Sequence, residues 1–396
     1  MSKKPLSLFE GFGIELEYMI VDRDNLMPKF ICDKVLEKIA GHKTMHIEDG
    51  LIAWSNELAL HVIELKCNGP QNDLDAVSKK MHSAIKDMNL TLEAYNAQLL
   101  PTAMHPLFNP NDGTLELWSG EDIEIYDTYN RIFGCSGHGW GNLQSIHINL
   151  PFANDEEFYL LHSAIRMILP LLPAFAASSP LVEGKWGPLL DSRLHFYLEN
   201  QRRIPSILGD AIPEAVRNKS EYENLILKPM YRDIQHLDPD GILSHEWLNS
   251  RAAIARFERN AIEIRILDIQ ECVKSDFILI NAIIAAIKHL VKKAQPDRQI
   301  QVTQNSLQNI LYGVLQHQGN YFIDDQLYLD CIGASNNNVK NVFTCLLDQS
   351  DLPFHFNENN LAQRIKTKLG EHIDRETILK EYKVLAKCLD ENCIYE

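Results

Sequence analysis

The sequence lacks the glycine-rich signatures that most often hold phosphate groups. It contains no GxxxxGK[ST] loop and no GxGxxG segment between a strand pattern and a helix pattern. It also lacks a basic excess, because 54 acidic and 38 basic side chains give a net charge of −16. Nucleic acid and anionic membranes are bound by clustered Lys and Arg, so both are excluded as main partners. A single anionic ligand held in a locally positive pocket, or through metal ions, is compatible with this charge.

Long apolar runs and paired cysteines are missing as well. The longest apolar run, residues 277–287, is interrupted by Asn281 and is too short to span a bilayer. Residues 1–10 lack the apolar core of a signal peptide. The cysteines are scattered without a CxxC pair, which favours reduced and mostly buried thiols, and we expect a cytoplasmic protein. They are Cys32, Cys67, Cys135, Cys272, Cys331, Cys345, Cys388 and Cys393.

With 396 residues, of which 45% are hydrophobic, the chain can bury a large core in one domain or two. Strand and helix patterns alternate in its first part, with a long amphipathic helix expected within residues 74–99. From about residue 295 the chain becomes polar and linker-like, and helical patterns follow. We therefore expect an α+β domain over residues 1–294 and a helical C-terminal extension over residues 295–396.

The first strand pattern, GIELEYMIVD, places two glutamates side by side. Ile14, Leu16 and Tyr18 alternate with Glu15 and Glu17, which is the period of a strand with one apolar face. The two carboxylates therefore project from the same, opposite face of the strand.

Two later strand patterns repeat this arrangement. In SIHIN, Ser145, His147 and Asn149 share one face, and in AIEIRI, Glu263 and Arg265 share one face. Both patterns place isoleucines on the other face. The polar side chains are therefore expected to face away from the core.

A strand is also expected over residues 57–66, where Glu64 is the acidic residue. Glu57 lies seven residues earlier, so a regular strand would place it on the opposite face. Glu57 can join Glu64 only if it lies before the strand proper or at a bulge.

Each of these strands taken alone is well explained by a solvated face of an antiparallel sheet. Together, however, their polar positions are nearly all acids with one His and one Arg, and no lysine is expected to dilute them. Like charges at neighbouring strand positions are destabilising unless a cation lies between them. Carboxylates with one imidazole suit Mg²⁺ or Mn²⁺ better than zinc, for which no Cys/His cluster is present.

Metal ions on a sheet face suggest phosphate chemistry, because Mg²⁺ bridges nucleotide phosphates and neutralises the charge that develops in transfer. Without a P-loop, arginines would have to assist the metal ions. For most of them a surface salt bridge is the better interpretation, and Arg265 beside Glu263 is the exception. The candidates are Arg193, Arg202, Arg203, Arg251, Arg256 and Arg265.

Six segments within residues 10–290 resemble, in order, the motifs of the glutamate–cysteine ligase family, in particular its bacterial carboxylate–amine ligase branch. They are GIELEYMIVD, NELALHVIELKCN, PTAMHPLF, SIHINLPF, LLPAFAASSPLVEGKWGPLLDSR and NAIEIRILDIQEC. The resemblance implies a glutamine-synthetase-like fold. This is a curved antiparallel sheet with helices packed on its convex face and the active site on its concave face.

The resemblance further implies ATP- and Mg²⁺-dependent amide bond formation through an acyl phosphate, with an amino acid and an amine as substrates. Glutamate with cysteine is one option among several amino-acid pairs. By motif position, Arg265 would face the transferring phosphoryl group, and Arg193 would bind a carboxylate or phosphate. Arg251 and Arg256 compete for one nucleotide-binding role. The metal ligands would be Glu15, Glu17, Glu57, Glu64, His147 and Glu263.

Two departures and two alternative functions accompany this resemblance. The histidine strand reads His-x-Asn where many carboxylate–amine ligases have His-x-His, and the C-terminal hundred residues match no motif. One alternative is a catalytically inactive relative that binds a nucleotide or amino acid as a regulator, and the other is a phosphotransferase on the same fold. The sequence leaves the oligomeric state open, a homodimer included.

Overall fold

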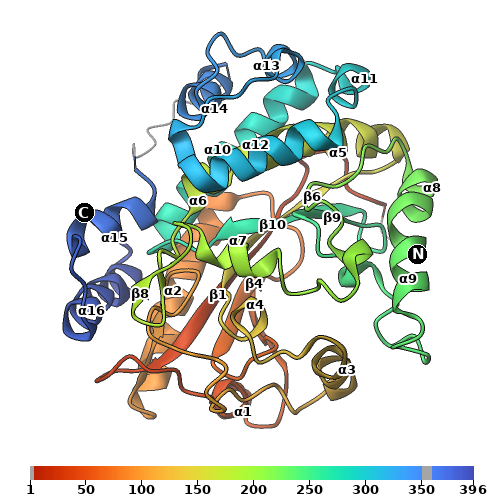
Figure 1. The fold of residues 1–396 in the computed structure, drawn as a ribbon. Helices are drawn as coiled ribbons and strands as arrows, with labels where there is room; N and C mark the ends of the chain where they lie inside the picture. The colour runs from red at the N-terminus through yellow and green to blue at the C-terminus, as the bar shows by residue number, and fades with distance from the viewer. Residues whose placement is uncertain (1–3, 350–358) are drawn as a thin grey trace.

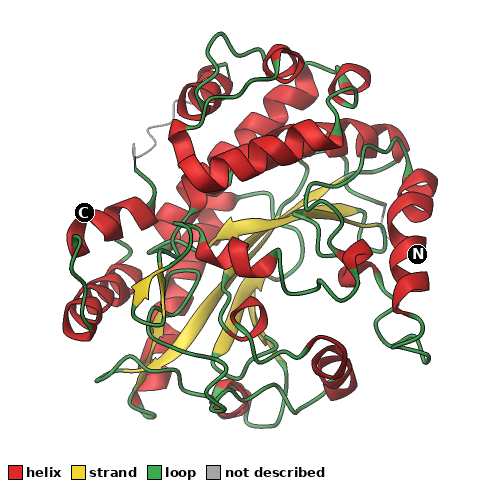
Figure 2. Cartoon of the chain, in the orientation of Figure 1, coloured by secondary structure: helices red, strands yellow, loops and turns green. Residues whose placement is uncertain are grey.

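The computed structural model describes residues 4–349 and 359–396, and within them eight strands form one antiparallel sheet (Figures 1 and 2). The strands follow the order β2-β3-β4-β1-β6-β10-β9, and β5 pairs with the second half of β1. A separate small hairpin joins β7 (Leu181–Val182) to β8 (Lys185–Trp186). The sheet strands are β1 (Gly13–Asp22), β2 (His46–Asp49), β3 (Ile52–Asn56), β4 (Val62–Cys67), β5 (Ala97–Leu100), β6 (Ser145–Pro151), β9 (Ala253–Arg256) and β10 (Ala261–Asp268).

Helices surround the sheet and connect its strands (Figure 2). Those in the first three hundred residues are α1 (Cys32–Ala40), α2 (Leu74–Glu93), α3 (Ile123–Phe133), α4 (His138–Gly141), α5 (Asp155–Ile168), α6 (Pro173–Ala176), α7 (Ser192–Tyr197), α8 (Lys219–Tyr222), α9 (Lys228–Ile234), α10 (Val273–Lys292) and α11 (Pro296–Gln299). Those that follow are α12 (Gln304–His317), α13 (Gln326–Ile332), α14 (Val339–Asp348), α15 (Leu361–Leu369) and α16 (Arg375–Glu391). Short 3₁₀ turns span Leu169–Leu171, Pro205–Ile207, Glu246–Leu248 and Gln318–Asn320, and one π-helical turn spans Glu223–Leu227.

The central strand β1 separates an apolar face from a polar one, as its alternation predicts. Ile14, Leu16 and Tyr18 are fully buried in one core with the apolar side chains of α2 and α10. The hydroxyl of Tyr18 donates a hydrogen bond to Asp276 on α10. The helices thus cover the apolar face and leave the opposite face for the polar side chains, which confirms the expected α+β class.

The amphipathic helix α2 is shorter than expected. It begins after Asp73, whose carboxylate accepts a hydrogen bond from the backbone of Ala76, an N-cap contact. It ends at Glu93, because Asn96 takes a left-handed backbone conformation with a φ of 50°. The chain then returns as β5, so the last residues of the expected helix form an edge of the sheet.

The strand expected over residues 57–66 is also shorter, because residues 57–61 connect β3 to β4. His61 in this connection is buried, and its ring centroid lies 5.3 Å from those of both Phe30 and Phe108. This packing anchors the connection to the protein interior. Glu57 therefore lies before the strand proper, one of the two arrangements that allow it to join Glu64.

The described residues after 294 are mainly helical, as expected, and they form two groups (Figure 1). Helices α11 to α14 pack near α5, α6 and α10, whereas α16 packs against α2 and β5. Leu361 and Tyr382 share a small apolar cluster with Met19 of β1. The proposed domain boundary at residue 294 stays a prediction. Among the described residues, none of the helices combines the length and the apolar character needed to cross a bilayer.

We expect Leu16→Ala to destabilise the fold by about 2–5 kcal/mol, because Leu16 is fully buried behind the polar face and its truncation leaves a cavity. Urea unfolding of the two proteins measures the difference. Leu90→Ala is the control, since Leu90 on α2 is 65% exposed and should change stability by no more than about 0.5 kcal/mol. Equal losses in the two variants would contradict the assigned core face of β1.

Candidate active site

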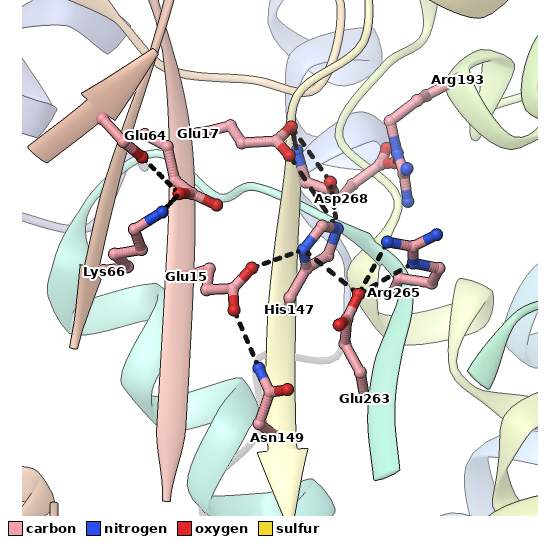
Figure 3. A network of polar contacts seen from close by, with 12 residues as sticks. Glu15, Glu17, Glu64, Lys66, His147, Asn149, Arg193, Glu263, Arg265 and Asp268 are labelled. Atoms are coloured by element: carbon pink, nitrogen blue, oxygen red, sulfur yellow. Dashed lines mark hydrogen bonds and ion pairs between the residues drawn. The ribbon is translucent and has the colours of Figure 1, made fainter. Parts of the chain in front are cut away.

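The strand register brings the polar side chains of β4, β1, β6 and β10 into neighbouring rows (Figure 3). Glu15 pairs with Lys66 of β4 on one side and with His147 of β6 on the other. Glu17 pairs with Glu64 of β4. Directly opposed residues of an antiparallel pair share a face, so these side chains converge on the same surface.

This surface is the floor of a cavity of about 1280 Å³. That volume exceeds the roughly 300–1000 Å³ of common small-molecule sites and leaves room for more than one substrate. All six residues predicted as metal ligands line the cavity, as do Arg193, Arg256 and Arg265.

His147 and Glu15 form the centre of the cluster. His147 Nδ1 lies 3.0 Å from Glu15 Oε2, and Asn149 donates to Glu15 Oε1 over 3.0 Å. Burial alone would lower the pKa of His147, but its hydrogen bond with Glu15 and the charges of neighbouring glutamates raise it to about 9. Burial works to raise the pKa of Glu15, and the hydrogen bond and charge of His147 hold that pKa well below its ordinary value.

Gly13 makes room for Asn149 in this arrangement. The two residues are directly opposed, and a Cβ on Gly13 would lie 3.1 Å from Asn149 Cβ. The glycine at the start of the G-x-E-x-E pattern thus leaves space on the cavity floor beside Glu15. Asn149, in the His-x-Asn pattern of β6, acts here as a hydrogen-bond donor to Glu15.

Glu17 is held by the backbone and side chain of Ser145. Its Oε2 accepts hydrogen bonds from Ser145 N at 2.7 Å and Ser145 Oγ at 3.0 Å. Its other oxygen, Oε1, lies 3.9 Å from His147 Nε2. These contacts orient the carboxylate toward the histidine.

Glu64 has a cationic partner that the sequence argument did not anticipate. Lys66 lies two residues further along β4, on the same face, and its ammonium forms an ion pair with Glu64 Oε2. The expectation that no lysine dilutes the acidic face is therefore wrong. Ser55 Oγ donates to the same oxygen over 2.7 Å, and burial together with Glu15 raises the pKa of Glu64 to about 7.

Glu57 reaches the cavity from the β3–β4 connection. Its carboxylate has no hydrogen bond or ion pair with any residue in the described part of the chain. Burial and the charges of Glu17 and Glu64 raise the pKa of Glu57 well above its ordinary value. Without a bound cation, the raised pKa favours the protonated, neutral form of Glu57, and a cation in the cavity would stabilise its charged form.

Glu263 is the most heavily compensated acid of the cluster. Its Oε1 lies 2.7 Å from Arg265 Nη2, and its Oε2 lies 3.2 Å from Arg256 Nη1. Burial works to raise the pKa of Glu263, but the charge of Arg265 lowers it. The two arginines make this side of the cavity positive.

A bulge in β10 adds Asp268, which was not among the predicted site residues. Ile264 pairs with Ile148, but the next registered pair on this side is Leu267 with Ile146, so one extra residue lies between them. The extra residue turns Asp268 onto the polar face. A regular alternation from Glu263 would have placed it in the core, so only the bulge could have revealed it.

Asp268 positions Arg193 at the cavity. Arg193 Nε lies 2.6 Å from Asp268 Oδ1, and both side chains are almost fully buried. Arg193 Nη2 has no hydrogen-bond partner among the described residues. Arg193 lies in the first turn of α7, which Asp191 caps by accepting from Leu194 N. A buried arginine at the cavity thus keeps one donor for an anionic ligand.

Arg251 is not brought to the cluster. Its guanidinium forms a bidentate pair with Glu214, with Nε–Oε2 and Nη2–Oε1 distances of 2.6 Å each. It is not among the described residues that line the cavity, whereas Arg256 is. Of the two arginines that compete for the nucleotide-binding role, the structure places only Arg256 near the predicted metal ligands.

Aromatic side chains from outside the sheet also line the cavity. They are Tyr126, Tyr129, Trp140, Tyr197 and Trp247. The ring centroid of Tyr129 lies 5.3 Å from that of Trp140 and 5.9 Å from that of Trp247. These rings offer flat apolar surfaces to a ligand in the cavity.

The residues present fit a divalent metal ion. One donor atom each from Glu15, Glu64 and His147 lie within 4.8 Å of one another. The carboxylate of Glu57 lies on the same side, near Glu17 and Glu64. Carboxylate oxygens with one imidazole are the donor set of Mg²⁺ and Mn²⁺ sites. The roles of the six residues as metal ligands stay predictions.

A family model and one relative match most of the chain. The model described as Glutamate-cysteine ligase family 2 (GCS2) matches residues 11–318. A protein of Archaeoglobus fulgidus described as uncharacterized is 32% identical over 383 residues, which cover 97% of this chain and 99% of that protein.

Two solved structures share the fold at low sequence identity. The bifunctional glutathione synthetase of Pasteurella multocida matches with a TM-score of 0.58 and 13% identity over 96% of this chain and 53% of that chain. This chain therefore spans about half the length of that synthetase. The glutamate–cysteine ligase of Francisella tularensis, solved in complex with AMP, matches with a TM-score of 0.57 and 15% identity over 97% and 89% of the two chains. These likenesses confirm the expected glutamine-synthetase-like fold class.

We expect Asp268→Asn to destabilise the protein by about 3–5 kcal/mol, because it leaves the buried guanidinium of Arg193 without its counter-charge. Urea unfolding measures the change. Asp330→Asn is the control, because Asp330 pairs with Arg298 at the surface and should contribute about 0–1 kcal/mol. If Asp268→Asn cost no more than this control, the buried pair would not hold Arg193 in place.

Proposed function

Because the chain belongs to glutamate-cysteine ligase family 2, we propose that it is an ATP- and Mg²⁺-dependent carboxylate–amine ligase that forms a γ-glutamyl-type amide bond. Its membership confirms the resemblance drawn from the six motifs. The observation that carries the proposal is the convergence of the predicted metal ligands and of Arg265 on the floor of one cavity. The ligase of Francisella tularensis, whose structure contains AMP, supports a nucleotide as one ligand.

The proposed reaction has two steps. An oxygen of the substrate carboxylate attacks the γ-phosphorus of ATP, the bond to the ADP oxygen breaks, and an acyl phosphate and ADP result. The amine nitrogen then attacks the acyl carbon, the carbon–oxygen bond to phosphate breaks, and the nitrogen loses a proton. The products are the amide, ADP and inorganic phosphate.

Bound Mg²⁺ would supply positive charge that neutralises the phosphate oxygens. The residues that would hold it are Glu15, Glu17, Glu57, Glu64, His147 and Glu263, all at the cavity floor. This arrangement holds phosphate without a GxxxxGK[ST] loop or a GxGxxG segment, and the sequence contains neither.

The arginines would hold the anionic groups of the substrates. Arg265 is anchored by Glu263 through Nε and Nη2, and its raised pKa keeps it charged, although burial works in the opposite direction. It would therefore stabilise the transferring phosphoryl group. Arg193, with one donor free, would bind a carboxylate or phosphate oxygen, and Arg256 would assist at the nucleotide.

The proposal is tested by incubating the protein with ATP, Mg²⁺ and a panel of amino acids and amines. Release of ADP and phosphate that requires both a carboxylate and an amine, with an amide product, would support the ligase. Release of ADP with a phosphorylated product and no amide would support the phosphotransferase. Nucleotide binding without turnover on the whole panel would support the regulator. Glutamate with cysteine is the first pair to test, and the homodimer stays a prediction.

We expect Glu15→Gln and Glu263→Gln each to lower turnover by more than about 100-fold, since even the outer-shell partners of a metal contribute about 10–100-fold. Both changes preserve side-chain size, so circular dichroism and the unfolding midpoint should show an intact fold. Glu48→Gln is the control, because Glu48 lies on the exposed strand β2. Full activity in either cluster variant would show that the metal ligands are assigned incorrectly.

A further inference from the structure

Lys66 lies in the cluster, but none of the motifs gives it a role. It lies directly opposite Glu15 in the sheet and two residues from Glu64, and it lines the cavity. Its ammonium forms an ion pair with Glu64 Oε2, while 30% of the Lys66 side chain stays exposed to the cavity (Figure 3). Lys66 thus places a tethered positive charge among the predicted metal ligands.

The lysine and arginine side chains of the cluster divide its acids into two groups. Arg265 lies 2.7 Å from Glu263, and Lys66 forms an ion pair with Glu64. Each of these two acids therefore has its own protein cation.

The other acids, Glu15, Glu17 and Glu57, form no ion pair with a lysine or arginine among the described residues. These are therefore the acids that remain available to a divalent ion. At Glu64, by contrast, the position of a cation is already taken.

An ammonium and a divalent ion compete for one carboxylate. Glu64 supplies one of the three donor atoms that lie within 4.8 Å of one another, and Oε2 of the same carboxylate accepts from Lys66. A divalent ion at this carboxylate would meet the positive charge of Lys66 at short range, where Coulomb repulsion is strong. The ammonium donates up to three hydrogen bonds and cannot dissociate from the chain.

We propose that Lys66 is a permanent cation that replaces one divalent ion at the Glu15–Glu64 side of the cluster. The inference rests on the proposed function, because it assumes that the remaining acids bind divalent metal. It deepens that function by stating that the wild-type cluster takes up one divalent ion fewer than the same acids would bind without Lys66. Lys66 is in this sense a positioning residue for the metal-bound state.

The experiment counts bound Mn²⁺ directly. Electron paramagnetic resonance of free Mn²⁺ during titration gives the number of ions bound per chain, independently of turnover. We expect Lys66→Met to bind one Mn²⁺ more per chain than the wild type, and Lys66→Arg, which keeps the charge, to match the wild type. Lys80→Met is the control, because Lys80 pairs with Asp49 at the surface and is 31% exposed, close to the exposure of Lys66.

The possible outcomes separate the inference from the proposed function. An equal Mn²⁺ count in the wild type and Lys66→Met would overturn the role of Lys66 and leave the ligase proposal intact. A lowered unfolding midpoint with an unchanged count would likewise overturn it, because a merely structural ion pair predicts that result. Failure of all variants to bind Mn²⁺ would overturn the metal assignment itself. If Lys66→Met does not fold, Lys66→Gln, which is polar and uncharged, decides the question by the same count.

Discussion

The arrangement of the site depends on one electrostatic constraint, which is that carboxylates buried on the same sheet face must each meet a positive charge. The strand register brings Glu15, Glu17, Glu64 and Glu263 onto that face, and Glu57 joins them from a connection. Protein cations satisfy part of this demand. Glu17 and Glu57 have no lysine or arginine partner among the described residues, and under the proposed function a divalent ion would supply the missing positive charge there.

Much of this arrangement could be predicted from the sequence, because side-chain alternation in a strand is a local property. The period of two in β1, β6 and β10 was sufficient to place Glu15, His147 and Glu263 on a common polar face. For Glu57 the sequence predicted only that it could join Glu64 if it lay before the strand proper or at a bulge. Whether it does so depends on how residues 57–61 fold around the buried ring of His61, which is a long-range contact.

The remaining features of the site could not be predicted, because they arise from irregular or distant contacts. A bulge turns Asp268 onto the polar face, where it pairs with Arg193, and the alternation of β10 conceals this. Lys66, by contrast, follows the local alternation, because it lies two residues after Glu64 within the expected strand and therefore shares its face. Arg251 and Arg256 are indistinguishable by spacing. Only the tertiary structure shows that Arg251 pairs with Glu214, whereas Arg256 lines the cavity.

The same constraint distributes charge unevenly across the cavity. Arg256 and Arg265 surround Glu263 on the β10 side, whereas Glu57 and Glu17 lie toward β4 without a close cation of their own. An anionic group entering the cavity is therefore attracted toward β10 and a cation toward β4. Glu17, Glu263 and Arg265 lie on strands of one sheet, and the packing of His61 anchors the connection that carries Glu57, so the separation of charge is built into the fold. Under the proposed function, this separation would orient a metal-bound phosphate before any chemistry occurs, which is the condition that phosphoryl transfer requires.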